Sequence, residues 1–390
     1  MDISLTPTNV HVNTYIPDDI IVFSILSKLS LKSLKRFACV RKSWSGLFND
    51  PTFMTMYSKS FLTKGQSYYD DKSLLLYMIV DGEDKYSLYS LSGERFENRF
   101  KLDWRKCFLE NQDDQLPVSW FEILGFVSIN GTICLRGGCN GVKKIILWNP
   151  TTNEFKVIPS SFCEHGNCLS HFSYNHLVGY DRVRDDYKVI QFTECTPCNP
   201  KDFSKNFWEI YSLRSNSWRK IDVNMPNTYR YIEQVYMDGV THECWGKRGR
   251  QSFLGSFDFS RESFVRTPLP SYVDDCFDIA WKHLVILNGS IAFILNYKKT
   301  STFDILILGE VGVKKSWTKL FTVGALPACL AYPFIAGNKG KILFGRKDGE
   351  LVWFDLNTGM IDEIGVKATK YSCMMLFHKE CILPIGGIYN

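Results

Sequence analysis

A turn pattern that recurs six times after residue 72 restricts the fold of this 390-residue chain more than any other feature. Five of the repeats contain an Asn-Gly or Asp-Gly pair, which tolerates the positive backbone angles of hairpin turns. These pairs are Asp81-Gly82, Asn130-Gly131, Asp238-Gly239, Asn288-Gly289 and Asp348-Gly349. A polar turn followed by a large apolar residue also recurs, as SLSGERF (90–96), WNPTTNEF (148–155), SLRSNSW (212–218), DFSRESF (258–264), EVGVKKSW (310–317) and DLNTGMI (355–361).

The final residues of these second turns are 59, 63, 46, 53 and 44 residues apart. Intervals of roughly 50 residues, with about four short strands in each, are typical of β-propeller blades. A blade buries its faces only against neighbouring blades, so several blades must close into a ring. We therefore predict a mainly β fold with a propeller of about six blades over residues 72–390. An antiparallel β-sandwich is the alternative. The run 371–385 has no blade of its own and is predicted to pair with strands near Leu74–Val80 and close the ring.

The segment 16–57 has a different character, with apolar residues at helical spacing. Pro17 and the acidic pair after it predict a helix start, and Ser30 is a suitable N-cap for a second helix. A short third helix around Trp44 is predicted to end near residues 49–51. Because a unit this small rarely buries enough apolar surface by itself, its surplus is expected to contact another protein.

The order of residues in this segment resembles the F-box. The matching residues are Ile16-Pro17, Asp18-Asp19, Leu29, Lys32-Ser33-Leu34, Arg36-Phe37, Cys39-Val40, Lys42, Trp44, Asp50-Pro51 and Phe53. The match runs for about forty residues without a gap, and Ile16 departs mildly from the usual Leu. The resemblance implies a flexible N-terminus (1–14), an F-box module (15–62) and docking to a Skp-type adaptor of a cullin–RING (SCF) ubiquitin ligase.

Nine residues are candidates for contacting the adaptor or supporting that contact, and the sequence does not separate these two roles. They are Ile16, Pro17, Ile20, Ile25, Leu26, Leu29, Leu34, Val40 and Trp44.

The region after residue 120 resembles the plant F-box-associated, kelch-like propeller domain. The matching phrases are LWNPTTNEFKVIP, VGYDRVRDDYKVI, WEIYSLRSNSWRKI, MDGVTHECW, FDFSRESFVRTPLP and FDILILGEVGVKKSWTKL. One departure lies at His242-Glu243-Cys244-Trp245, because the family usually places Trp directly after His. The strand register there is therefore left open.

The distribution of charge and the cysteines indicate which kind of partner and which cellular compartment to expect. Residues 16–64 contain eight basic and three acidic side chains, which equals the whole net charge of +5. This basic unit is also strongly apolar, which favours an acidic protein partner over nucleic acid. No secretory signal is visible, so the thirteen cysteines are interpreted as reduced thiols of a cytoplasmic or nuclear protein. The uncharged run 320–338 contains prolines and glycines, and we expect buried strands there and no membrane contact.

Side chains that could carry chemistry are few. Cys163, His165, Cys168 and His171, with Cys195 and Cys198 after them, offer thiolate and imidazole groups for zinc. Their spacing is not a common zinc pattern, and loops between blades are the simpler interpretation. The acidic cluster Asp181, Asp185 and Asp186 is interpreted as a solvated turn. No nucleophile elbow, Walker loop or His-Glu-x-x-His helix occurs, and no cofactor is expected.

The leading hypothesis is therefore a non-catalytic adaptor whose helices bind the ligase core and whose propeller binds a target protein. The alternatives are a propeller enzyme with a helical cap and a nucleic-acid binder that uses its basic helices. The sequence does not reveal the target or which rim of the propeller binds it. The insertions 103–118 and 193–206 are candidates by length and polarity.

Overall fold

The computed structural model divides the chain into two compact units, Met1–Thr63 and Lys64–Asn390. It describes residues 20–385 except for gaps at 30, 48–49, 54–55, 58–71, 80–85, 94–95, 105–119, 140–141, 162–167, 198–204, 227–233, 246–251, 275–278, 298, 301, 325–326, 328, 338–339, 368–372 and 382–384. No helix within these described ranges combines the length and apolar character needed to cross a bilayer.

The first unit is helical but irregular. It contains the π-helical turn η1 (Ile21–Ile25), the 3-10 turn η2 (Leu26–Lys28), α2 (Leu31–Ala38) and α3 (Lys42–Ser45). The amide of Leu26 donates to the carbonyl of Ile21, five residues earlier, which makes the first turn wider than an α-helix. The predicted starts at Pro17 and Ser30 lie outside the described residues.

The Asp50-Pro51 pair begins a helical turn at residues 51–53, although the sequence placed a helix end there. Asp50 Oδ1 accepts hydrogen bonds from the amides of Thr52 (2.8 Å) and Phe53 (3.0 Å), and Pro51 takes the first helical position, where its missing N–H costs nothing. The predicted third helix, α3, ends earlier, at Ser45.

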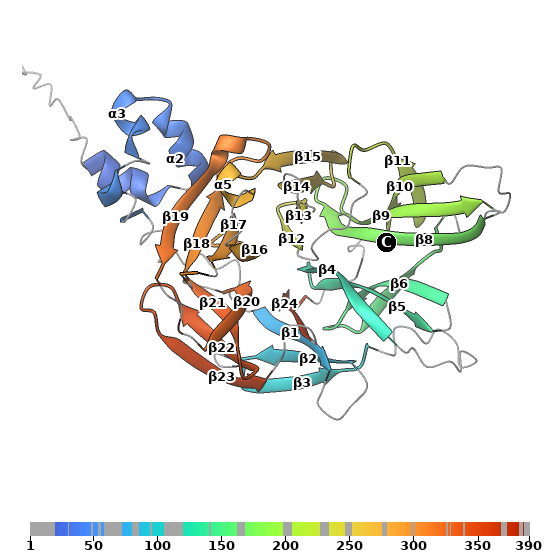
Figure 1. Cartoon of the computed structure of the whole chain (residues 1–390). Coiled ribbons are helices and arrows are strands. Elements are labelled where there is room, and N and C mark those ends of the chain that lie inside the picture. The colour runs from blue at the N-terminus through green and yellow to red at the C-terminus, as the bar shows by residue number, and fades with distance from the viewer. Residues whose placement is uncertain are drawn as a thin grey trace, which may run out of the picture. The chain divides into compact units, whose positions relative to one another are not determined.

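The second unit consists of six antiparallel four-stranded sheets arranged in a ring (Figure 1). Blade 1 contains β24 (Cys373–Lys379), β1 (Lys72–Ile79), β2 (Tyr86–Ser92) and β3 (Asn98–Leu102). Blade 2 contains β4 (Trp120–Ile129), β5 (Thr132–Cys139), β6 (Val142–Asn149) and β7 (Glu154–Ile158). Blade 3 contains β8 (Cys168–Asp181), β9 (Asp186–Pro197), β10 (Lys205–Ser212) and β11 (Ser217–Ile221). Blade 4 contains β12 (Gln234–Met237), β13 (Val240–Trp245), β14 (Phe253–Asp258) and β15 (Ser263–Pro268). Blade 5 contains β16 (Ile279–Leu287), β17 (Ser290–Tyr297), β18 (Phe303–Leu308) and β19 (Trp317–Val323). Blade 6 contains β20 (Leu330–Ala336), β21 (Lys341–Arg346), β22 (Glu350–Asp355) and β23 (Ile361–Lys367). The predicted six-bladed propeller is confirmed, and the β-sandwich alternative is wrong because the strands form six separate sheets.

The ring is closed by the last strand of the chain. β24 pairs antiparallel with β1 over seven residue pairs from Lys72↔Lys379 to Met78↔Cys373, which confirms the predicted closure. Beyond β24 the chain continues onto blade 2, where the Cys381 carbonyl accepts a hydrogen bond from Asn149 Nδ2 at 2.8 Å. The Ile385 side chain is buried against residues of blades 2 and 3. The C-terminal segment therefore joins blade 1 to blade 2 as well as completing blade 1.

The turn residues behave as their chemistry requires. Both residues of Asn130-Gly131, Asp238-Gly239 and Asn288-Gly289 have positive φ values, the mark of type I′ hairpin turns. Asp348-Gly349 differs, because only Gly349 has a positive φ (85°) and the pair joins the second and third strands of its blade. Asp81-Gly82 lies outside the described residues. All six polar turns predicted from the sequence join the third and fourth strands of a blade.

The strand that carries His242-Glu243-Cys244-Trp245 is regular. β13 pairs with β14 without a shift, from Val240↔Asp258 to Trp245↔Phe253. The departure from the family pattern therefore leaves the register of blade 4 intact.

Candidate functional site

The structure separates the nine candidate adaptor-contact residues into buried and exposed groups. Leu26 and Leu34 are only 2% and 1% exposed. Phe53 and Tyr57 are also buried, their rings stack at 6.0 Å, and the Tyr57 hydroxyl donates to the Leu29 carbonyl at 3.3 Å. Leu26 and Leu34 are therefore interior residues, whereas Leu29 is half-buried.

The exposed group is strongly apolar. Ile20, Ile25 and Val40 are exposed to 51%, 47% and 73% of their surface. Phe23 and Phe37, which the sequence interpretation left out of its site, are exposed to 38% and 42%. The sequence shows the helical spacing of Phe23 and Phe37, but it does not show whether their side chains are buried or exposed. Ile16 and Pro17 lie outside the described residues.

Trp44 lies between these groups and is half-buried. The edge of its indole meets the Phe37 ring, with centroids 6.3 Å apart, and the Arg41 guanidinium lies 5.8 Å from the indole centroid. Lys28, Arg36 and Lys42 are exposed, and the sequence from Ile20 to Leu47 contains no acidic residue. The exposed part of this unit is therefore both apolar and positively charged.

The two rims of the propeller differ in which connections between strands they carry. Antiparallel strands reverse direction at each turn, so the connections between first and second strands and between third and fourth strands meet one rim. This tight-turn rim carries short turns such as 130–131 and 259–262. The strand ends that lead between blades and from second to third strands lie at the opposite rim, which we call the long-connection rim; Leu102, Pro197 and Ile221 are such ends. Of the insertions singled out in the sequence, 103–118 follows one of these ends, and 193–206 includes the end of β9 and the start of β10.

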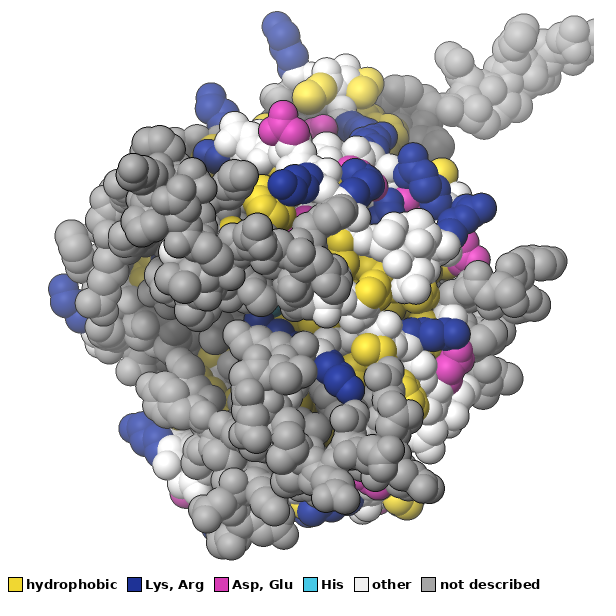
Figure 2. Space-filling model, turned by 90° about the vertical axis from the view of Figure 1, so that its right-hand side faces the viewer, with side chains coloured by type: hydrophobic (Ala, Val, Ile, Leu, Met, Phe, Trp, Pro, Cys, Tyr) yellow, Lys and Arg dark blue, Asp and Glu magenta, His cyan; other side chains and the backbone are white. Residues whose placement is uncertain are grey.

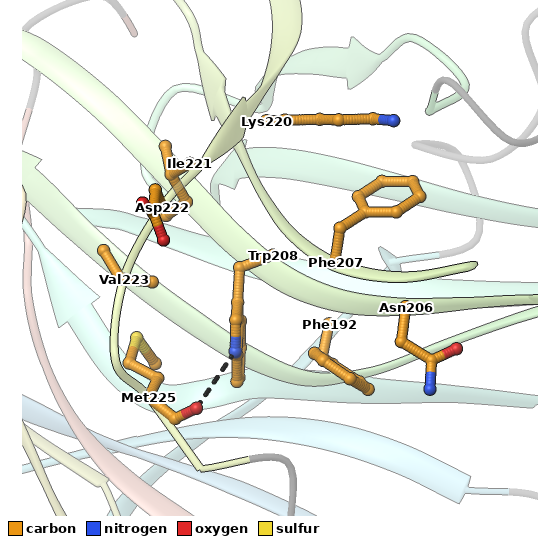
Figure 3. A pocket seen from close by; sticks show the side chains of 9 residues that line it. All are labelled: Phe192, Asn206, Phe207, Trp208, Lys220, Ile221, Asp222, Val223 and Met225. Carbon is orange, nitrogen blue, oxygen red and sulfur yellow. Dashed lines mark hydrogen bonds between the residues drawn. The ribbon is translucent and has the colours of Figure 1, made fainter.

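A groove opens on blade 3 where β10 begins and β11 ends, which is the long-connection rim (Figure 3). Its volume is about 560 Å³. It is lined by Phe192, Asn206, Phe207, Trp208, Lys220, Ile221, Asp222, Val223 and Met225.

The solvated-turn interpretation holds for Asp185, which is exposed in the turn 182–185, but it is wrong for Asp181 and Asp186, which are buried. The Asp181 side chain is fully buried and accepts hydrogen bonds from Lys188 Nζ (2.7 Å), Arg184 (2.9 Å) and Ser260 Oγ (2.8 Å). Burial alone would raise the pKa of Asp181, but these hydrogen bonds outweigh it and hold the pKa well below its ordinary value. Asp186 is also buried and accepts from Ser212 Oγ at 2.6 Å. Asp181 and Asp186 therefore have a structural role.

The zinc candidates are not brought together by the part of the structure that is described. Cys163, His165 and Cys198 lie outside it, and Cys168 and His171 lie on β8 without a described side chain. Cys195 is disulfide-bonded, so the expectation of thirteen reduced thiols is wrong at this position. Among the described side chains, no group of three or more His, Cys, Asp or Glu is placed to hold a metal ion.

The surface view gives no sign of a continuous basic band. On the face shown in Figure 2, Lys and Arg side chains are interspersed with Asp and Glu side chains across the described surface. A nucleic-acid-binding face would instead gather its cations in one stripe or patch.

Comparisons with known proteins agree with this architecture. The family model described as the F-box associated beta propeller domain matches residues 121–380. The F-box protein CPR1 of Arabidopsis thaliana is 26% identical, over 96% of this chain and 91% of its own length. An Arabidopsis F-box/kelch-repeat protein is 25% identical over 77% of this chain and 78% of its own length.

Other similarities are less complete. One further Arabidopsis F-box protein is 25% identical over 66% of this chain, and the match spans 61% of that relative's length. Among solved structures, TolB from Acinetobacter baumannii is similar with a TM-score of 0.45 and 12% identity, over 84% of this chain and 72% of TolB.

Proposed function

This chain belongs to the family of proteins with an F-box associated β-propeller domain, and we propose that it is the substrate-recognition subunit of an SCF ubiquitin ligase. In this proposal the helical unit binds a Skp-type adaptor and the propeller binds a target protein. The chain itself performs no chemistry. It speeds ubiquitin transfer by holding the target at high effective concentration near the loaded conjugating enzyme. Its place of action would be the cytoplasm, the nucleus or both.

One observation carries the adaptor half of this proposal. Five large apolar side chains of a small helical unit are exposed while its interior is already filled by Leu26, Leu34 and their buried neighbours. The exposed side chains are Ile20, Phe23, Ile25, Phe37 and Val40. Exposed apolar residues at this density are typical of protein interfaces, and the surrounding Lys and Arg side chains suit an acidic partner.

The target half rests on the difference between the rims. Binding residues concentrate on connections that a rigid scaffold holds in place. The tight-turn rim offers short turns, and part of it is occupied by the C-terminal segment around Cys381 and Ile385. The connections that leave the long-connection rim are longer in sequence, and the blade 3 groove opens at this rim, where β10 begins and β11 ends. We therefore assign target binding to the long-connection rim.

Co-purification tests the adaptor contact. We expect the full-length chain, co-expressed with a Skp-type adaptor, to retain the adaptor on an affinity resin and to lose it when Ile20 and Ile25 are both replaced by Ser. The matched control is Phe100→Ser, which removes an apolar side chain that is 64% exposed on β3. Adaptor retention by the double variant would refute the assignment. A gel shift with duplex DNA, weakening steeply with salt, would instead support the nucleic-acid alternative.

A further inference from the structure

An aromatic row crosses blade 3 next to the groove. Tyr174 on β8 pairs directly with Phe192 on β9, and Phe192 pairs directly with Trp208 on β10. Adjacent ring centroids are 5.4 Å and 5.0 Å apart. Ile221 on β11 continues the row as the partner of Trp208. Phe192, Trp208 and Ile221 line the groove, and together they give it an aromatic and aliphatic floor.

The wall of the groove is held in place by hydrogen bonds. Trp208 Nε1 donates to the Met225 carbonyl at 3.3 Å, as Figure 3 shows. From blade 4, Arg266 donates to both the carbonyl and the side-chain oxygen of Asn224, at 3.0 Å and 3.1 Å. The short segment after β11 is therefore tied to two blades, and the groove is preorganised rather than formed by a loose end of chain.

The polar side chains that line the groove are Asn206, Asp222 and Lys220. Asp222 lines the groove and is exposed, and no hydrogen bond or ion pair holds its carboxylate among the described residues. Asn206 is exposed and lies directly opposite Glu194 in the β9–β10 ladder, two residues from the Trp208–Phe192 pair and so on the same face. The Glu194 carboxylate accepts a hydrogen bond from the Tyr174 hydroxyl at 2.6 Å.

Two described cations, Lys220 of the lining and Arg266 of blade 4, each lie against an aromatic ring. Lys220 extends on the other side of β10, where its Nζ lies 4.1 Å from the centroid of the Phe207 ring (Figure 3). The Arg266 guanidinium lies 5.3 Å from the centroid of the Phe253 ring and donates a hydrogen bond to the Asn224 carbonyl. The groove therefore combines an apolar floor, in which Phe192 and Trp208 are 4% and 5% exposed, with the exposed carboxylate of Asp222, while the Lys220 ammonium of its lining lies against Phe207.

We propose that the blade 3 groove binds an Arg or Lys side chain of an extended segment of the target protein. A cation gains from a neighbouring carboxylate, and the alkyl stem of Arg or Lys suits a floor of Trp, Phe and Ile. Asn206 is placed to hydrogen-bond the backbone of the same segment. This inference rests on the proposed function only in naming a target protein as the source of the side chain.

The proposal can be tested by measuring how much full-length chain binds to immobilised octapeptides in which one residue is fixed and the others are varied. Arrays with Arg or Lys at the fixed position are expected to retain about tenfold more chain than arrays with Leu or Glu, and Asp222→Asn should abolish that preference. The control is Asp185→Asn, the same change at an exposed site on the tight-turn rim of the same blade, where the positive φ of 55° also suits Asn. This variant should keep the preference.

Equal retention on all four arrays would overturn the proposal, and so would a preference that survives Asp222→Asn. The adaptor co-purification described above separates this result from the proposed function. If the chain binds the adaptor but shows no selection for Arg or Lys, the groove assignment fails alone. If selection holds while adaptor binding fails, the ligase assignment fails and the groove stands.

Discussion

The Nζ atom of Lys188 lies 2.7 Å from Oδ2 of Asp181, and both side chains are almost completely buried. Lys188 also donates to Glu262 Oε1 at 2.9 Å and to the Phe259 carbonyl at 3.0 Å. Asp181 and Lys188 belong to blade 3, whereas Phe259 and Glu262 belong to the last turn of blade 4. One ammonium group therefore ties the hairpin of one blade to the turn of the next.

Replacing Lys188 with Met is expected to destabilise the propeller strongly. The change leaves the buried Asp181 carboxylate without its closest cation, and breaking a buried pair in this way typically costs about 3–5 kcal/mol. Urea unfolding followed by circular dichroism measures the loss. The control is Arg219→Met, because Arg219 pairs with the same Glu262 but is 54% exposed, and we expect its loss to cost at most about 1 kcal/mol. Equal losses for the two variants would contradict this account of the network.

We expect His378 to make closure of the ring sensitive to mild acid. It lies on β24, is buried, and its Nδ1 is 2.9 Å from the Ser128 hydroxyl on β4. Burial lowers the pKa of His378 to about 4, below the value of about 6.5 expected in the unfolded chain. The unfolded state therefore binds a proton first as pH falls, so stability present above about pH 6.5 is lost progressively toward pH 4.

The test compares the wild-type chain with His378→Gln, which cannot titrate but can still hydrogen-bond. Between about pH 7 and pH 5, the wild type should lose about 2 kcal/mol more of its unfolding free energy than the variant does. Buried His242, whose pKa is also lowered to about 4, contributes in both proteins and cancels in the comparison. Parallel pH profiles would show that His378 does not contribute.

The turns and the ring were predictable from the sequence because their signals are local. Asn288-Gly289 predicts a hairpin by itself, since few other residue pairs tolerate two positive φ values. The role of Asp181 was not predictable in this way. Its partner Ser260 is 79 residues away, as is the region of Glu262, which pairs with Lys188, and nothing near Asp181 in the sequence distinguishes a buried ion pair from a solvated turn.

The helical site was only partly predictable for a related reason. Apolar spacing marks Ile25 and Leu26 as equivalent candidates, and a regular α-helix would set the exposure of each from its position around the axis. The π-helical turn at Ile21–Ile25 and the 3-10 turn after it change that rotation, so Leu26 is buried while Ile25 is exposed. The irregularity comes from packing in three dimensions, which periodicity does not encode.

Removal of β24 should abolish the stable propeller. Truncation after residue 371 leaves β1 paired with β2 alone and exposes the residues that β24 covers, including Leu75 and Tyr77. An open ring with an unpaired strand edge is expected to aggregate and to lose its cooperative thermal transition. The control is truncation after residue 385, which keeps β24 and buried Ile385 and should leave the transition temperature unchanged. A cooperative transition in the shorter chain would show that blade 1 does not need this strand.

Ile25 and Leu26 are adjacent in the chain, but replacement by Ala should destabilise the helical unit only at Leu26. Leu26 is 2% exposed, and truncating a buried Leu typically costs about 2–5 kcal/mol, so Leu26→Ala should unfold the small helical unit and lose adaptor binding for that reason. Ile25 is 47% exposed, and its replacement should change stability by less than about 0.5 kcal/mol. If Ile25 is an interface anchor, binding should still weaken by about 2 kcal/mol. Titration calorimetry with the adaptor, alongside thermal melts of each variant, separates the two effects. Unchanged affinity for Ile25→Ala would remove it from the docking surface.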